Sequence, residues 1–156
     1  MNNLTLVIGI GNRYRSDDML GTLVVDELRK QAQKGIEVVE SDGQAASLME
    51  LWQGYSSVII VDAVVSGAEV GTIHRVDLHK QYLPTNFGAY SSHGIGVAEA
   101  IELARVLRVL PPFTILLGME GKWCTASEQS SNWLKQATEI LVEQILVEIQ
   151  QGENCS

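Results

Sequence analysis

Short apolar runs alternate with longer amphipathic stretches along the whole of this chain. The runs are rich in β-branched residues, which is typical of strands buried on both faces of a parallel sheet. The amphipathic stretches carry apolar residues at helical spacing. The predicted strands cover residues 4–10, 36–41, 57–63, 72–78 and 113–119. The predicted helices run from about 17 to 34, 45 to 52, 92 to 109 and 126 to 150.

Strands that alternate with helices predict an α/β fold, a three-layer sandwich. We expect a mostly parallel, twisted sheet of about five strands with helices on both faces. The segment 72–78 alternates more and holds charges, so we expect an exposed edge strand that could run antiparallel. The 156 residues contain no repeat, linker or low-complexity segment, which predicts a single domain over residues 1–156.

Composition narrows the range of partners. The formal net charge of −8 argues against nucleic acid and against an anionic membrane surface. No apolar run approaches the ~20 residues of a membrane-spanning helix, and the start of the chain does not resemble a signal peptide. Cys124 and Cys155 are far apart and belong to no CxxC pair, which favours a reducing compartment. We therefore expect a cytoplasmic protein, and a monomer.

The first strand ends in Gly9-Ile10-Gly11, which invites a dinucleotide-binding interpretation. The full fingerprint needs a third glycine at the position of Tyr14, and the acids Asp17 and Asp18 would repel a pyrophosphate. We instead interpret the two glycines as allowing a sharp turn of the chain at the sheet edge.

Three residues carry most of the chemical information: Asp18, Asp62 and His93. Each follows a predicted strand or stands at a predicted helix start, and the carboxyl ends of parallel strands lie along one edge of a sheet. We expect the three side chains to converge there as a mixed oxygen and nitrogen metal site with open coordination positions. Taken singly, Asp18 could be a helix-start acid, Asp62 a solvated strand-end carboxylate, and His93 a partner of a local backbone group.

Further polar residues are expected at the same edge. Asp42 follows the second strand and is a candidate for contacting a substrate, whereas Glu120 is interpreted as a loop carboxylate. His74 and His79 are interpreted as surface residues. Gly94 and Gly96 weaken the helix that follows His93, which makes sense if something must approach its start closely. No serine or cysteine has an evident adjacent base, so a covalent nucleophile is not indicated.

Several segments together resemble one known family. GIGNRYRSDDMLG resembles the N-terminal motif of the nickel-iron hydrogenase maturation proteases, with a strand, G-x-G-N, a loop, an acidic pair and a later glycine. VIIVDAV resembles their second motif, SSHG their third, and LLGMEG their segment at the last strand. The order and spacing match over nearly the whole chain.

The resemblance implies an aspartyl-type endopeptidase that removes the C-terminal extension of a hydrogenase large-subunit precursor after nickel insertion. It implies that Asp18, Asp62 and His93 are both catalytic and metal-binding, with nickel supplied by the precursor. The first acid is often glutamate in the family. Asn12, Asp42 and Gly43 are implied in substrate recognition, although the family's Asp-Gly-Gly-Thr string reads Asp42-Gly43-Gln44-Ala45 here.

Two other functions remain open from the residues themselves. The same three side chains could serve an autonomous zinc-dependent hydrolase. They could also belong to a non-catalytic module that delivers or senses nickel. The sequence indicates no general base apart from the two acids of the predicted site. Nickel could act as a recognition handle, and it could also polarise the scissile carbonyl or activate water.

Overall fold

The computed structural model describes residues 4–11, 19–31, 33–64, 66–83, 95–121 and 129–154. The strands in these ranges are β1 (Thr5–Ile10), β2 (Ile36–Ser41), β3 (Ser57–Val64), β4 (Ile73–Asp77) and β5 (Phe113–Glu120). The helices are α1 (Met19–Gln31), α2 (Ala45–Leu51), α4 (Ile95–Leu107) and α5 (Gln129–Asn154). All predicted strands are confirmed, with bounds that shift by at most one residue. The predicted helices are also present, and α5 continues past the expected end at residue 150.

The strands form one sheet in the order β2-β1-β3-β5-β4. β1 pairs in parallel with β2 and with β3, and β3 pairs in parallel with β5. β4 lies at the edge and runs antiparallel to β5, which confirms the expectation for residues 72–78. The order reverses between β1 and β3, and ligands of open α/β sheets bind at the carboxyl ends of the strands beside such a reversal.

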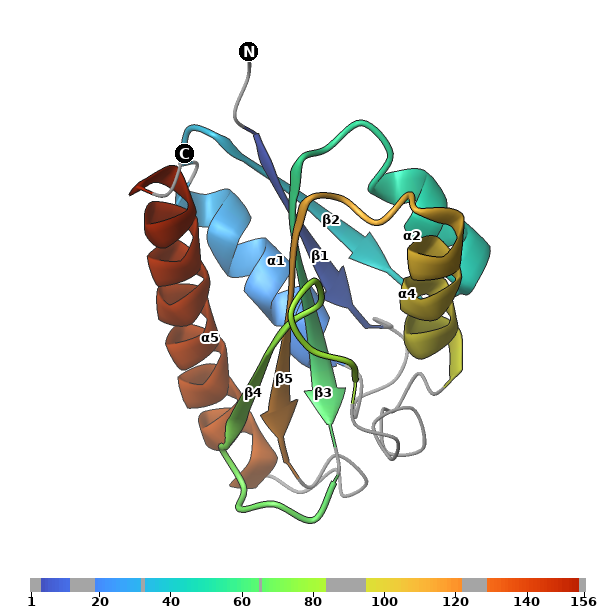
Figure 1. Ribbon diagram of the computed structural model, residues 1–156. Coiled ribbons are helices and arrows are strands. Elements are labelled where there is room, and N and C mark those ends of the chain that lie inside the picture. The colour runs from blue at the N-terminus through green and yellow to red at the C-terminus, as the bar shows by residue number, and fades with distance from the viewer. Residues whose placement is uncertain are drawn as a thin grey trace.

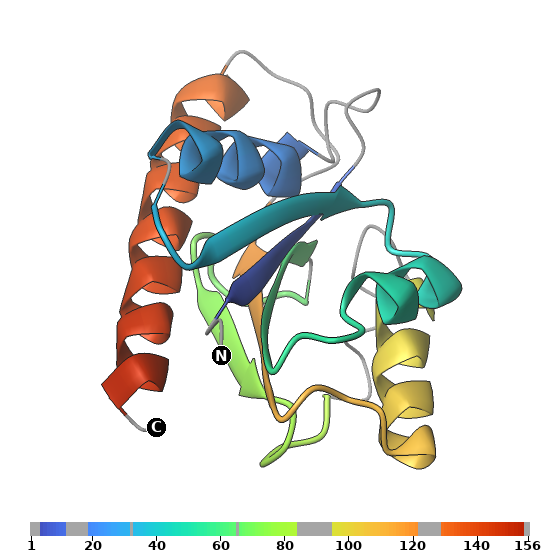
Figure 2. The ribbon, with the colours of Figure 1, turned by 90° about the horizontal axis from the view of Figure 1, so that it is seen from above.

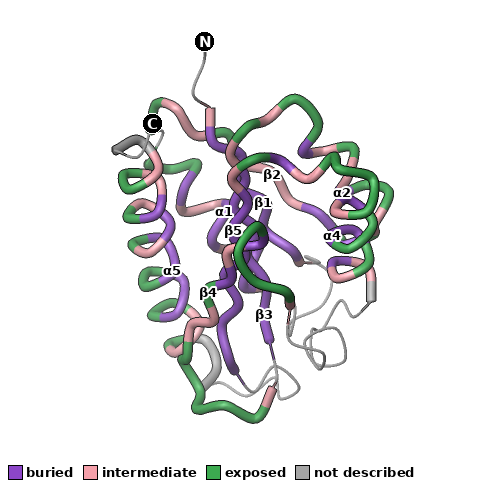
Figure 3. The backbone as a smooth tube through the Cα atoms, in the orientation of Figure 1, coloured by how far each residue is buried: buried purple, intermediate pink, exposed green. Residues whose placement is uncertain are grey.

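Helices cover both faces of the sheet, so the predicted three-layer α/β sandwich is confirmed. α1 and α5 lie on one face, and α2 and α4 lie on the other (Figures 1 and 2). Along β3 the side chains alternate between the two layers: Val58 and Ile60 join the core under α2 and α4, whereas Ile59 and Val61 join the core under α1 and α5. Each such buried aliphatic side chain contributes about 1.5–3 kcal/mol relative to exposure. Figure 3 shows the central strands buried almost throughout.

β1 and α1 pack backbone against backbone through two glycines. A Cβ on Gly9 would lie 2.4 Å from the carbonyl oxygen of Gly21, and a Cβ on Gly21 would lie 2.2 Å from that of Ile10. Gly9 lies inside β1 and does not adopt a positive φ, so the interpretation that it makes a sharp turn is wrong. Its role is steric, because only glycine permits a helix to approach a strand this closely.

An ion pair with one buried partner joins the edge strand to the long C-terminal helix. Glu148 on α5 is almost fully buried, and its carboxylate accepts two hydrogen bonds from Arg75 on β4, at 2.5 and 3.0 Å. Gln144, one turn earlier on α5, donates a third at 3.2 Å. The hydrogen bond to Glu148 raises the pKa of Arg75 above its ordinary value, so the guanidinium stays charged wherever the protein is folded.

Candidate functional site

Asp62 lies near the carboxyl end of β3, beside the reversal in strand order. Its side chain is on the α2 and α4 face, because it alternates in step with Ile60 and Val64, which pack in that core. Asp62 is 0 % exposed, and its Oδ1 accepts a hydrogen bond from the Ala63 amide at 2.8 Å. The alternative of a solvated strand-end carboxylate is therefore wrong. A buried carboxylate in an otherwise aliphatic strand is costly, and such groups concentrate at functional sites.

Asp18, His93 and Asn12 lie outside the described residues, so their convergence with Asp62 stays a prediction. Among the residues that the structure does describe, no group of three or more His, Cys, Asp or Glu side chains could hold a metal ion. The predicted metal site draws two of its three ligands from outside those ranges, and it stays a prediction for the same reason.

The start of α4 touches the loop that follows β2. A Cβ on Gly96 would lie 2.2 Å from the carbonyl oxygen of Gly43, so no larger residue fits at position 96 without movement of this loop. Gly43 itself has a φ of +86°, a conformation that favours glycine. At Gly96 the expected close approach is thus made by Gly43, a residue predicted to take part in recognition.

Asp42 is exposed beside Gly43 at the carboxyl end of β2. Its Oδ1 accepts a hydrogen bond from the Gln44 amide at 3.2 Å, while the Gly43 amide donates to the hydroxyl of Ser41 at 3.1 Å. An open hollow of about 550 Å³ adjoins this loop, lined by Glu40, Ser41, Asp42, Ser47, Glu50 and Leu51. The position and exposure of Asp42 suit contact with another molecule.

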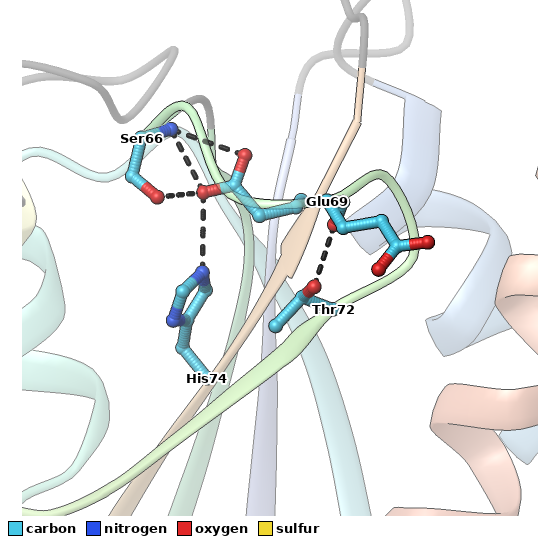
Figure 4. Close-up of polar contacts among 5 residues, drawn as sticks. Ser66, Glu69, Thr72 and His74 are labelled. Atoms are coloured by element: carbon cyan, nitrogen blue, oxygen red, sulfur yellow. Dashed lines mark hydrogen bonds and ion pairs between the residues drawn. The ribbon is translucent and has the colours of Figure 1, made fainter.

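Glu120 and His74 form a pair that sequence reasoning missed. Glu120 is the last residue of β5 and is 2 % exposed, so the interpretation as a loop carboxylate is wrong. Its carboxylate accepts hydrogen bonds from the Ser66 amide at 2.8 and 3.1 Å, from the Ser66 hydroxyl, and from Nε2 of His74 at 3.1 Å (Figure 4). The side chain of His74 is 30 % exposed, so it is a partly buried residue with a carboxylate partner and not a plain surface residue. His79 is exposed, as expected.

The strand register brings His74 into the same row as Asp62. Asp62 of β3 pairs with Gly118 of β5, and Gly118 pairs in turn with His74 of β4. Residues paired across a sheet point to the same face, so Asp62 and His74 share the α2 and α4 face. Between them stands a residue without a side chain. The sequence signal for this arrangement was a histidine in an edge strand and a glutamate ending a buried strand.

Comparison with known proteins places the chain in a family. The family described as hydrogenase maturation protease matches residues 22–148. The chain belongs to this family. Its resemblance to the hydrogenase maturation proteases, noted above from motifs, is thereby confirmed.

Curated relatives in the family have related names. The hydrogenase expression/formation protein HupD of Thiocapsa roseopersicina is 28 % identical over 119 residues, which are 74 % of this chain and 53 % of HupD. This chain thus spans about half the length of that relative. A Methanocaldococcus jannaschii protein that bears the provisional name of a hydrogenase maturation protease is 30 % identical over 153 residues, which are 90 % of this chain and 95 % of the relative.

Solved structures show the same fold. The hydrogenase maturating endopeptidase HybD from Escherichia coli superimposes with a TM-score of 0.71 at 19 % identity, over 96 % of this chain and 93 % of HybD. The maturation protease HycI from Thermococcus kodakarensis gives a TM-score of 0.60 at 23 % identity, over the same shares of the two chains. The chain therefore has the HybD-like fold. None of the helices in its described residues is long and apolar enough to cross a membrane.

Proposed function

We propose that this chain is an endopeptidase that removes the C-terminal extension from the large-subunit precursor of a nickel-iron hydrogenase after nickel insertion. Membership of the hydrogenase maturation proteases supports proteolytic processing of a hydrogenase precursor. The observation that carries the site assignment is the fully buried Asp62 at the carboxyl end of β3, beside the reversal in strand order. That position is the usual ligand site of an open α/β sheet.

Nickel belongs to the substrate in this proposal. The precursor presents it, and Asp18, Asp62 and His93 bind it and thereby recognise a precursor that has received its metal. Carboxylate and imidazole groups are suitable ligands for a divalent first-row metal ion, and three of them leave positions for ligands from the precursor. The burial of Asp62 supports this role, because a carboxylate in a site shielded from water interacts more strongly with a cation.

Recognition of the precursor involves Asn12, Asp42 and Gly43 in the same proposal. The exposure of Asp42 beside an open hollow supports this assignment. The contact between Gly43 and Gly96 supports it as well, because Gly96 is three residues after His93 in the sequence. A precursor held at the β2 loop would thus be held next to the start of α4.

The test is incubation of the purified protein with nickel-loaded and nickel-free precursor, followed by mass measurement of the products. We expect the loaded precursor to lose a C-terminal peptide and the nickel-free precursor to stay intact. Loaded precursor that remains intact after prolonged incubation would contradict the proposal and favour a non-catalytic nickel-binding module. Turnover of generic peptides by a protein purified with tightly bound metal would favour an autonomous zinc-dependent hydrolase.

A further inference from the structure

The pair of His74 and Glu120 has no role in the proposed function. Glu120 is buried and receives its hydrogen bonds from Ser66 and His74, whereas the His74 side chain is 30 % exposed. An ionised carboxylate can only accept, so Nε2 of His74 is the donor, and in the neutral ring Nδ1 then carries the lone pair. A half-exposed imidazole held by a buried carboxylate is the arrangement of a general base with its orienting partner.

The location of the pair matches the candidate site. His74 and Asp62 lie in one row across β4, β5 and β3, with Gly118 between them. Two inter-strand spacings separate their Cα atoms by roughly 10 Å. Both side chains are on the α2 and α4 face, at the end of the sheet where the parallel strands finish. A separation of this size matches a scissile peptide group and one water molecule held between a metal-binding carboxylate and a base.

We propose that His74 is a catalytic residue that accepts and returns the proton in peptide hydrolysis, and that Glu120 positions its ring. The inference rests on the proposed function and adds to it a base distinct from Asp18, Asp62 and His93. Glu120 acts through His74, because its carboxylate fixes the tautomer and the direction of the imidazole.

The step balances without an oxidant or a reductant. The oxygen of a water molecule forms a bond to the scissile carbonyl carbon, and one water proton passes to Nδ1 of His74. When the tetrahedral intermediate collapses, the C–N bond breaks and the leaving nitrogen takes the proton from His74. One water molecule is consumed and the first products are a carboxylic acid and an amine. The acid then loses the second water proton to the amine, giving a carboxylate and an ammonium group, and His74 returns to its starting tautomer.

The same pair also ties the β3–β4 connection to the end of β5, through the hydrogen bonds of Ser66 to Glu120 (Figure 4). Figure 4 shows the carboxylate of Glu69, in this connection, pointing away from the His74 ring. Because the hydrogen bonds of Ser66 to Glu120 give the pair a structural role as well, the structural and the catalytic role need separate tests. A glutamine at position 74 can still donate to Glu120 but accepts no proton near neutral pH, so it separates the two roles.

The experiment measures kcat and KM for nickel-loaded precursor with the wild type, His74→Gln, His74→Ala and Glu120→Gln. The control is His79→Gln, since His79 is exposed and its ring contacts the Pro111 carbonyl oxygen, near the start of β5. We expect His74→Gln to lower kcat by about 10²–10⁴-fold, the usual range for loss of a general base, with KM changed less than about threefold. Glu120→Gln should lower kcat by a smaller factor, and His79→Gln should match the wild type.

Chemical rescue distinguishes a catalytic role of His74 from a structural one, because added imidazole can replace a lost proton acceptor. Added imidazole should restore part of the activity of His74→Ala and none in His74→Gln, where the site of the ring stays filled. Wild-type kcat in His74→Gln would overturn the inference while leaving the proposed function in place. An inactive His74→Ala that imidazole does not rescue, together with an active His74→Gln, would assign the pair a structural role. Failure of the wild type to cleave loaded precursor would overturn the proposed function and this inference together.

Discussion

Asp62 occupies a position where a carboxylate is hard to accommodate and an amide is not. It is fully buried, and its Oδ1 already accepts a hydrogen bond from Ala63. An asparagine has nearly the same shape and can make the same hydrogen bond through its carbonyl oxygen. This hydrogen bond does not require the negative charge, and we propose that the charge serves binding.

We predict that Asp62→Asn leaves the melting temperature near that of the wild type but lowers processing by more than about a hundredfold. Mutation of a residue that merely hydrogen-bonds to a metal ligand already reduces metal affinity or activity by up to that factor. Asp77→Asn is a matched control, because Asp77 also ends a strand but accepts from the His79 amide, away from the candidate site. Equal processing by the wild type and Asp62→Asn, at equal folded concentration, would remove Asp62 from the site.

At the scale of elements, the contact between α4 and the loop after β2 fixes the position of Asp42 and Gly43, which are proposed to recognise the precursor. The backbones of Gly96 and Gly43 meet with no space for a Cβ. Interiors packed to this density respond to an extra methyl group by moving backbone, at a cost of about 1–3 kcal/mol. The backbone movement would occur where the loop after β2 meets the start of α4.

We predict that Gly96→Ala destabilises the protein by about 1–3 kcal/mol and also weakens the apparent affinity for the precursor. The matched control is Gly152→Ala, another glycine within a helix, where the nearest atom would be 3.9 Å from the new Cβ. That variant should be neutral or stabilised by up to about 1 kcal/mol, the helix propensity of alanine over glycine. Urea unfolding and precursor binding are measured for both. Similar stabilities of the two variants would contradict the close contact.

The ion pair between Arg75 and Glu148 joins elements that lie far apart in sequence. Removal of one partner leaves a buried charge without its counterpart, which typically costs about 3–5 kcal/mol, and less where one partner is partly exposed as Arg75 is. Replacement of both partners by apolar residues is often neutral. We therefore expect the pair to determine the position of β4 relative to α5 more than it increases the free energy of unfolding.

We predict that Arg75→Met destabilises the protein more than the double variant Arg75→Met/Glu148→Met does. Chemical unfolding of the two single variants and the double variant closes the cycle. Because Arg75 keeps its charge in every folded condition, the loss in Arg75→Met should be nearly constant between about pH 6 and 9. If the double variant loses as much free energy of unfolding as the two single variants lose together, or more, the result would contradict an isolated ion pair.

Hydrophobic periodicity predicted the elements well, because each buried strand must be apolar on both faces and each helix on one. It placed Asp62 near the end of its strand and β4 at the edge of the sheet. It could not predict which residues meet across strands, since this depends on register. His74 meets Glu120, 46 positions later, because β4 runs antiparallel to β5. Gly9 was misinterpreted for a similar reason: the α1 backbone that it contacts is a tertiary neighbour.

At the scale of the whole molecule, the proposed site is shared between two proteins. Under the proposed function the chain contributes two carboxylates and one imidazole, with no thiolate, and such a site would hold a late first-row metal ion less firmly than one with cysteine ligands. If the precursor provides the remaining ligands, binding of nickel and binding of the precursor must strengthen each other. The coupling is reciprocal by thermodynamic necessity.

We predict that the free protein binds nickel weakly and binds the nickel-loaded precursor at least about tenfold more tightly than the nickel-free precursor, a difference of about 1.4 kcal/mol. Calorimetry would compare titration of the protein with nickel and with each form of the precursor. Asp62→Asn is the control, and it should reduce the preference for the loaded form because one ligand is lost. Equal affinity of the wild type for the two forms would contradict a metal supplied by the substrate. Tight nickel binding by the free protein would instead indicate a complete site within this chain, which three ligands without a thiolate are not expected to form.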